Sequence, residues 1–465
     1  MNRRDFLKTS AAALAVGLSG CAGIEVKSGK GAGQRPNIIV ILSDDMGYAD
    51  LGVYGCKDVP TPHIDSLAKD GVRFTDAYAN GAVCTPTRAA LLSGRYQHRY
   101  GVEDLCGKSD KGETCFLPPQ ANPLPLRLKK AGYTTGMMGK WHLGAGEGLT
   151  PMDRGFDEFF GFLGGGHHYI IRPHGKAAYD APILRQREPV PETRYLTDAF
   201  GEEAVVFIER QRNATKPFFL YIAFNAVHMP FEANEKYTAR FPNITESNLR
   251  KYAGMLSAMD DAVGGVLAKL DEIGQRDNTL VIFHNDNGGF RNPGFGARNA
   301  PLRGSKSDTF EGGIRVPLLM RWPGVIQPGT TYRQPVITFD ISATALAVGK
   351  ADLSACDGAN LLPFLAGQQT GSPHAALFWR DRLRGNHYAA RQGDWKLVHS
   401  AEYGEPPGPV TDRLFNLAQD LSEQHDLAAE NPGKLAELKK LYEAWSAEVD
   451  ADCRKLGLEP KFSKL

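Results

Sequence analysis

The chain has 465 residues, which is enough for a large hydrophobic core and, by default, for two unequal domains. Its composition is that of a globular protein, with 42% hydrophobic and 23% charged residues, and its 54 Lys and Arg against 53 Asp and Glu leave a net charge of +1. This balance excludes a broad basic surface for nucleic acid, so any anionic ligand must be held by local basic groups.

The N-terminal residues are typical of an export signal. Arg3 and Arg4 come before a short apolar run over residues 11–18, which is too short to span a bilayer. The paired arginines resemble a twin-arginine signal, which implies the twin-arginine export machinery as a partner. The sequence Leu-Ser-Gly-Cys over residues 18–21 resembles a lipobox, with a chance cleavage site among small residues as the alternative.

Residues 22–35, which are rich in Gly and Lys, are predicted to form a flexible tether. The whole segment over residues 1–35 therefore predicts an exported lipoprotein, located in the periplasm or at the outer membrane or cell surface. Its only expected contact with a membrane is a lipid anchor on Cys21.

Two apolar runs that are far apart in the chain end in paired Asp or Asn residues. Residues 36–42 have the pattern of a strand buried on both faces of a parallel sheet, and Asp44 and Asp45 follow. Residues 279–284 form a similar run, followed by Asp286 and Asn287. Ligands bind beyond the carboxyl ends of such strands, and four oxygen side chains there suit calcium or magnesium. Strand-ending turns are the alternative, but they explain one Asp better than two.

Residues 81–95 have the pattern of a loop that leads into a helix. Thr85 is the predicted N-cap, and Pro86 is tolerated in the first turn. Cys84 would then lie beside free backbone N–H groups at the positive end of a helix dipole, where an anion is favoured. A buried structural cysteine is the alternative, and for a lone cysteine it would be preferred. Cys84 is not alone, because Arg88 completes a Cys-x-Pro-x-Arg pattern.

Three more segments place titratable side chains where a strand meets a loop. Lys140 and His142 follow a predicted strand and, being two residues apart in extended chain, project to the same side. His228 follows another strand in a His-x-Pro pattern, although a lone histidine there is usually structural. Lys306 lies in a polar segment just before the last strand of this region.

Together these motifs resemble the signatures of the type I sulfatases, which are formylglycine-dependent members of the alkaline-phosphatase-like superfamily. The resemblance covers residues 36–465, and the motifs fall in the family's order. Asn285 departs from the Ser or Thr that the family usually has before Asp-Asn-Gly. The fold implied is an α/β sandwich with a large, mostly parallel central sheet flanked by helices, plus a small C-terminal antiparallel sheet with a helix.

The resemblance also implies a mechanism, in which a formylglycine-generating enzyme oxidises a cysteine to an aldehyde whose hydrate attacks sulfur. Its second hydroxyl then allows the sulfate to leave without attack by water. The roles implied for individual residues are cation binding by Asp44, Asp45, Asp286, Asn287 and the modified Cys84, with calcium expected and magnesium as the alternative; positioning of the hydrate by Arg88; sulfate binding by Lys140 and Lys306; protonation of the leaving alcohol by His228; and expulsion of sulfate assisted by His142.

A long segment from Gly164 to about residue 190 has little periodicity, and long irregular loops in compact domains are usually functional. We expect His167, His168 and Arg172 in this loop to bind substrate, although adjacent histidines more often line a surface. An exported sulfatase suggests a sulfated carbohydrate as substrate.

Beyond residue 370 the pattern changes to short strands with tight connections, followed by a helix over residues 431–450. We therefore predict a catalytic domain over residues 36–370 and a C-terminal α+β subdomain over residues 371–465 that carries no chemistry. Two alternatives to a sulfatase stay open. One is a phosphonate monoester hydrolase or phosphodiesterase of the same superfamily, and the other is a non-catalytic binding protein on this fold.

Overall fold

The computed structural model describes residues 35–106, 115–170, 179–290, 296–382, 385–401 and 409–460, with the backbone of two short paired strands, β4 (Lys108–Ser109) and β5 (Gly112–Glu113). The predicted export signal, Cys21 and Arg172 lie outside these residues. Within the described part of the chain, no helix combines the length and the apolar composition needed to cross a bilayer.

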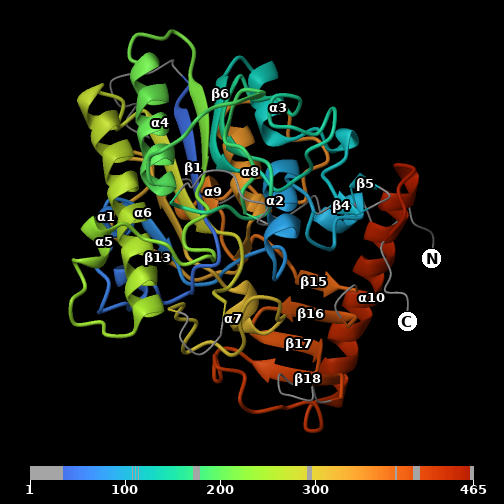
Figure 1. Ribbon diagram of the computed structural model, residues 1–465. Coiled ribbons are helices and arrows are strands. Elements are labelled where there is room, and N and C mark those ends of the chain that lie inside the picture. Colours follow the sequence, from blue (N-terminus) through green and yellow to red (C-terminus); the bar gives the residue numbers. More distant parts are fainter. Residues whose placement is uncertain are drawn as a thin grey trace, which may run out of the picture.

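In the described residues, ten strands form the central sheet, and those at its centre run parallel (Figure 1). The parallel strands are, in spatial order, β11 (Thr279–Asn285), β1 (Asn37–Ser43), β10 (Phe218–Ala223), β6 (Thr134–Lys140) and β7 (Glu158–Phe162). Outside β11 lie β12 (Leu318–Arg321), which is antiparallel to it, β2 (Val72–Phe74) and β13 (Thr330–Tyr332). Outside β7 lie the antiparallel β8 (Leu184–Arg185) and β9 (Glu188–Pro189). The predicted α/β fold is confirmed.

Helices cover both faces of this sheet, as Figure 1 shows. The layer at the left of the view consists of α1 (Pro62–Lys69), α4 (Leu196–Arg210), α5 (Glu235–Thr238) and α6 (Ser247–Glu272). The opposite layer consists of α2 (Cys84–Ser93), α3 (Leu124–Lys130), α8 (Phe339–Val348) and α9 (Leu362–Leu365). Single 3₁₀ turns span Gly52–Tyr54, Gln97–Tyr100 and Pro119–Ala121.

The two helical layers explain why the central strands are apolar without alternation. In β1, Ile39 and Ile41 pack into the core under α4 and α6, whereas Val40 and Leu42 pack into the core under α2, α3 and α8. Successive side chains of a strand point to opposite faces, so a strand covered on both sides must be apolar throughout. Polar residues are therefore left for the strand ends.

A second sheet follows, with four antiparallel strands in the order of the chain: β15 (Leu377–Asp381), β16 (His387–Gln392), β17 (Trp395–Ser400) and β18 (Thr411–Asn416). The long α10 (Pro432–Lys455) packs along it (Figure 1). Its core also includes side chains of the short α7 (Glu311–Ile314) and of the two-stranded sheet made by β3 (Ala77–Tyr78) and β14 (Val336–Ile337). The small sheet thus shares a core with residues that precede it in the chain.

Candidate active site

The predicted polar residues meet where neighbouring strands of the central sheet end. Parallel strands have their carboxyl ends at the same edge, so residues that follow different strands become neighbours there. The residues that the structure brings to this edge are Asp44 and Asp45 after β1, Asp286 and Asn287 after β11, His228 after β10, Lys140 and His142 at the end of β6, Cys84 and Arg88 on α2, and Lys306 before α7.

Cys84 is the first residue of α2, and it lies among these charges. Its Sγ is 3.5 Å from Asp44 Oδ1 and 3.7 Å from Lys306 Nζ. The prediction of Thr85 as N-cap is wrong: Val83 occupies that position, and the Thr85 hydroxyl instead donates to the His142 carbonyl at 3.2 Å. Every residue of α2 is buried, so the helix presents Cys84 from inside the core.

Three buried carboxylates are paired with three cationic side chains, of which Arg88 and Lys140 are fully buried and Lys306 is mostly buried. Lys140 Nζ is 2.5 Å from Asp44 Oδ2, and Lys306 Nζ is 2.7 Å from Asp45 Oδ2. Arg88 donates through Nε and Nη2 to Asp286 Oδ2, at 3.0 and 2.8 Å. We call these six residues, together with Cys84 and Asn287, the strand-end cluster.

Arg88 also links two parts of this cluster. Its Nη1 donates to the Lys140 carbonyl at 3.2 Å, so one guanidinium joins the end of β6 to the end of β11. The other oxygen of Asp286 accepts the backbone N–H of Asp45 at 3.3 Å. Arg88 therefore connects the ends of β6 and β11 beside Cys84.

Burial and neighbouring charges together shift the pKa values of the cluster. It raises the pKa of the Cys84 thiol to about 12, although Lys140 and Lys306 act in the opposite direction. Burial and the nearby Asp44 raise the pKa of Asp286 to about 6, against the effect of Arg88. Burial would also raise the pKa of Asp45, but Lys306 and His228 outweigh it and hold that pKa well below the usual range. An unmodified Cys84 is thus a thiol near neutral pH, and a thiolate nucleophile is disfavoured.

Left-handed backbone conformations at residues other than glycine also occur at this site. Asp45 (φ 59°), His142 (φ 57°) and Ser307 (φ 78°) all adopt left-handed conformations without being glycine. Such conformations cost about 1–3 kcal/mol each and persist where the surrounding structure imposes them, often at functional sites. Each of the three residues lies in the strand-end cluster or beside one of its lysines.

The side chains fit a divalent cation bound through oxygen. Asp44, Asp45, Cys84 and His228 each offer one ligand atom, and these atoms lie within 4.8 Å of one another. Asn287 donates through Nδ2 to Asp45 Oδ1 at 2.8 Å, while its Oδ1 is buried and finds no donor among the described residues. A buried acceptor without a partner costs about 1–3 kcal/mol, and a cation would satisfy it.

Asn285, which departs from the usual family residue, connects the segments after β1 and β11 that carry the predicted metal ligands. Its Oδ1 accepts from the Ser43 hydroxyl at 2.8 Å and lies 3.3 Å from the Met46 N–H, and its Nδ2 donates to the Met46 carbonyl at 2.7 Å. A hydroxyl side chain could not make all of these bonds, because it is shorter and has a single donor. The departure therefore strengthens the junction of β1 and β11.

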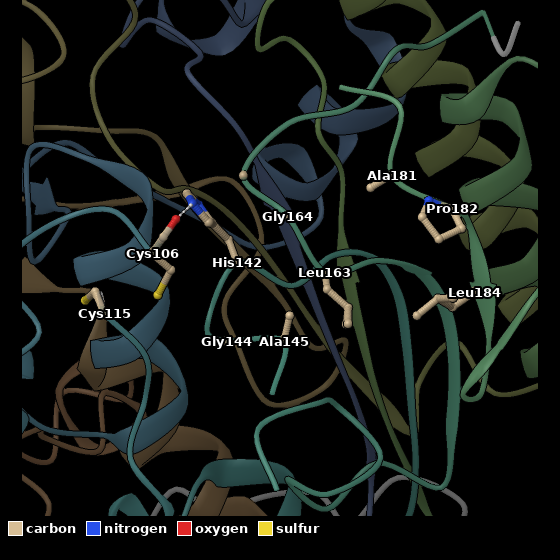
Figure 2. Close-up of a pocket in the computed structure, with 11 residues that line it drawn as sticks. Cys106, Cys115, His142, Gly144, Ala145, Leu163, Gly164, Ala181, Pro182 and Leu184 are labelled. Carbon is tan, nitrogen blue, oxygen red and sulfur yellow. Dashed lines mark hydrogen bonds between the residues drawn. The ribbon is translucent and has the colours of Figure 1, made fainter. Parts of the chain in front are cut away.

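His142 lies between the strand-end cluster and an apolar cavity. Its Nε2 is 3.3 Å from the Cys106 carbonyl, whereas its buried Nδ1 has no partner among the described residues. A Cβ on Gly165 would lie 2.5 Å from Nε2, so only glycine fits against the ring. Figure 2 shows the cavity, of about 440 Å³, with Leu163 and Leu184 in its lining.

His228 is supported by a tyrosine that the sequence did not reveal. Its Nε2 is 3.6 Å from Asp45 Oδ2, and its Nδ1 is 2.6 Å from the Met229 carbonyl. The hydroxyl of the buried Tyr169 lies 2.8 Å from the His228 carbonyl and also contacts that of Asn225. Only the position of Tyr169 in a long loop could have suggested this role.

The two adjacent histidines of this loop make contacts within the protein. Both ring nitrogens of the buried His167 lie 2.7 Å from backbone carbonyls, of His168 and Ala181. His168 Nδ1 is 3.0 Å from Glu232 Oε1, on the segment after β10. These contacts hold the loop in place near the strand ends. Substrate binding by the two histidines stays a prediction.

Comparison with known proteins agrees with this arrangement. A family model described as "Sulfatase" matches residues 36–351, and one described as "N-sulphoglucosamine sulphohydrolase, C-terminal" matches residues 305–445. The N-acetylgalactosamine-6-sulfatase of Canis lupus familiaris is 36% identical over 369 residues, covering 74% of this chain and 68% of the relative.

Solved structures give the same result. The structure titled "Ps i-CgsB in complex with k-i-k-neocarrahexaose" aligns with a TM-score of 0.83 and 36% identity, and covers 93% of this chain and 95% of that one. The phosphonate monoester hydrolase of Agrobacterium radiobacter aligns with a TM-score of 0.62 and 21% identity, covering 89% and 96%, which is a likeness of fold alone.

Proposed function

Because this chain belongs to the sulfatase family and is a sulfuric ester hydrolase, we propose that the strand-end cluster is its active site, with a formylglycine made from Cys84 and a divalent cation, calcium, as its reactive groups. The observation that carries the proposal is the position of Cys84 at the start of a buried helix, 3.5 Å from a carboxylate and 3.7 Å from a lysine. A formylglycine-generating enzyme would be the partner that oxidises the cysteine.

Asp44, Asp45, Asp286 and Asn287 would hold the cation together with residue 84, and the unpartnered Asn287 Oδ1 supports this set. When bound, the cation and the hydrated aldehyde supply an activated hydroxyl for attack at sulfur and a second hydroxyl that allows sulfate to be expelled.

Lys140 and Lys306 are placed to hold the sulfate oxygens. The three carboxylates and three cationic side chains of the cluster cancel in formal charge. A divalent cation would add two positive charges, which a singly charged sulfate ester and the negative charge that develops in the reaction would balance. Fixed ammonium groups aimed at that charge stabilise the transition state without reorganisation.

His228 would give a proton to the leaving alcohol. Burial and repulsion from Lys140 and Lys306 lower its pKa to about 4, although Asp45 acts in the opposite direction. A sulfate between the lysines would offset their charge and raise the proton affinity of His228. Substrate binding would thus be coupled to the uptake of one proton from solvent by His228. His142, buried beside Lys140, would assist the expulsion of sulfate.

We propose a sulfated carbohydrate as the substrate. Two similar proteins carry names or titles that point to carbohydrates, an N-acetylgalactosamine-6-sulfatase and a protein solved with a neocarrahexaose. The cavity beside His142 is nearly free of polar side chains, which suits the C–H face of a sugar ring next to the ester.

Matched esters would test the activity. Turnover of an aryl sulfate, the corresponding phosphate and a phenyl phosphonate should be compared, along with sulfate release from sulfated galactan and glycosaminoglycan oligosaccharides. We expect the sulfate ester to be preferred and an oligosaccharide to have the higher kcat/KM, because contacts remote from sulfur serve only the larger substrate. A preference for the phosphonate or phosphate would favour the superfamily alternative.

We also propose export as a lipoprotein, on the basis of Arg3, Arg4 and the segment that ends in Cys21. Replacing both arginines by lysine should retain the protein in the cytoplasm, whereas Cys21→Ala should release it from membranes. Unchanged cell fractionation in both variants would contradict the proposal.

A further inference from the structure

A second buried cluster of charges lies where the C-terminal sheet meets the catalytic domain. Lys396 Nζ, on β17, donates to Glu311 Oε1 at 2.8 Å and to Glu423 Oε1 at 2.9 Å. The side chains of these three residues are completely buried, and Glu311 Oε2 also accepts from Arg315 Nη1 at 3.0 Å. We call Glu311, Arg315, Lys396 and Glu423 the junction cluster.

This cluster fixes the start of α7. Glu311 is the first residue of that helix, and its backbone N–H donates to Glu423 Oε2 at 2.7 Å. Arg303, in the segment that leads to Lys306, donates through Nη1 to the Glu423 carbonyl at 2.7 Å. One glutamate of the C-terminal subdomain therefore holds both α7 and the beginning of the lysine-bearing segment.

The helix in turn contacts the turn that follows Asn287, and that turn contacts the segment that carries Lys306. The N–H of Gly288, directly after Asn287, donates to the Gly313 carbonyl at 2.9 Å. The N–H of Lys306 donates to the Gly289 carbonyl at 3.2 Å. The backbone of α7 thus supports the turn that carries a predicted cation ligand, and this turn holds the backbone of the predicted sulfate-binding lysine.

The backbone of α7 packs directly against the backbone of the neighbouring segments. A Cβ on Gly288 would lie 1.8 Å from the Gly312 carbonyl oxygen, and one on Gly313 would lie 2.1 Å from that of Asp308. Backbones in such close contact transmit a displacement instead of absorbing it. A shift of α7 at Glu311 must therefore move the turn after Asn287 and the segment around Lys306.

Stability alone explains the junction cluster poorly. Burying an ion pair costs several kcal/mol in desolvation for each ion, and apolar residues of similar volume often stabilise as well or better. What ionic hydrogen bonds add is a defined direction, because each donor must meet its acceptor. A cluster that fixes the position of a catalytic segment uses that property.

We propose that Lys396 and Glu423 of the C-terminal sheet are positioning residues for the sulfate site, because they fix α7 and, through it, Lys306 and Asn287. The inference rests on the proposed role of Lys306 in binding sulfate. The C-terminal subdomain then takes part in catalysis without touching the substrate.

A double-mutant cycle on sulfate binding tests the proposal. Binding of inorganic sulfate to the purified full-length protein is measured by calorimetry for the parent, Lys306→Ala, Lys396→Met and the double variant, with folding followed by near-UV circular dichroism. We expect Lys396→Met to weaken sulfate binding about three- to thirtyfold, the usual range for coupling through a network. In the Lys306→Ala background it should cause little further loss, since the two residues act as one unit.

Arg380→Met is the matched control. Arg380 is a buried cation of the same sheet, and its side-chain hydrogen bonds within the described residues go to Glu103, Ser446 and Asp450 rather than to α7. Its loss should lower stability and leave sulfate binding within twofold. If Lys396→Met does not fold, Glu423→Gln provides the same cycle, because it removes one charge and keeps an acceptor for the Glu311 N–H.

The outcomes separate the two proposals. If Lys306→Ala leaves sulfate binding unchanged, the role of Lys306 in the proposed function is wrong, and the inference falls with it. If Lys306→Ala weakens binding but neither Lys396→Met nor Glu423→Gln does, or if their effects are additive with it, only the positioning role is overturned. Restoration of sulfate affinity in Lys396→Arg would support it further.

Discussion

The strand-end cluster and the junction cluster are both buried and both built from Lys, Arg and carboxylates, yet they differ in completeness. In the junction cluster, the carboxylates of Glu311 and Glu423 accept from Lys396, and no side-chain atom of the cluster is buried without a partner. In the strand-end cluster, the buried Asn287 Oδ1 has no donor among the described residues, whereas left-handed backbone occurs in both clusters, at Asp45 and at Glu423. Burial of charge and backbone strain therefore do not separate the two clusters; the unsatisfied acceptor does.

The most drastic way to test this difference is to remove the nucleophile. Cys84→Ala should lower kcat/KM for an aryl sulfate by about 10⁵-fold or more, since no other group can form the covalent product. The change deletes one small buried side chain, so the unfolding free energy should fall by only about 1 kcal/mol. Chemical denaturation alongside the kinetics measures both. A large loss of stability would mean that Cys84 is structural.

Replacing one lysine in each cluster sharpens the comparison. Lys306→Met should lower kcat by about 10²–10³-fold, as expected for a donor to developing charge. Lys396→Met should lower the unfolding free energy by about 3–5 kcal/mol, because it leaves the buried Glu423 without its cation and Glu311 with Arg315 alone. If both variants lost stability and activity in the same proportion, the clusters would not differ in kind.

Calcium should stabilise the folded protein only by binding at the strand-end cluster. At about 100 times its dissociation constant, calcium should raise the unfolding free energy by about 2.7 kcal/mol. Asn287→Leu should abolish this gain, which thermal unfolding with and without chelator would record. Arg380→Met, which removes a buried cation outside both clusters, should retain it. An equal shift in Asn287→Leu would exclude Asn287 as a ligand.

Much of the strand-end cluster could be predicted because a local pattern carries it. Apolar runs predicted the central strands to within a residue or two. A polar pair directly after such a run, as at Asp44 and Asp45, indicates candidate ligand-binding residues at the strand end. Short motifs then predicted roles for Cys84 and Arg88. The start of α2 was misplaced by two residues, because Thr85 is used by His142 and Cys106 rather than as a cap.

The junction cluster could not be predicted, because no pattern in the sequence connects its members. Lys396 lies within a strand, Glu423 in a turn and Glu311 at the start of a one-turn helix, and each looks like an ordinary surface charge. Their burial arises only when the small sheet docks on α7. Residues 371–465 were therefore expected to carry no chemistry, and the positioning role inferred for Lys396 revises that expectation.

A further expected effect is a pH dependence that arises at His228, beside the strand-end cluster. Because the pKa of His228 in the free protein is lowered to about 4, its acidic form is lost as pH rises above that value. Since kcat/KM reports the free enzyme, it should fall with rising pH for an alkyl or sugar sulfate, by up to about tenfold per unit. A nitrophenyl sulfate, whose phenolate leaves unaided, should show a shallower fall. In His228→Gln the difference between the substrates should disappear; a difference that persists would assign the proton to another group.

The most direct measurement is the chemical identity of residue 84 in active protein. Mass spectrometry of the tryptic peptide Phe74–Arg88, from protein made with its maturation enzyme, should reveal a peptide lighter than the encoded one by the change from a CH₂SH to a CHO side chain, and this peptide should react with hydrazides. Specific activity across preparations should rise in proportion to the modified fraction. Full activity in a preparation that contains only unmodified Cys84 would contradict the account.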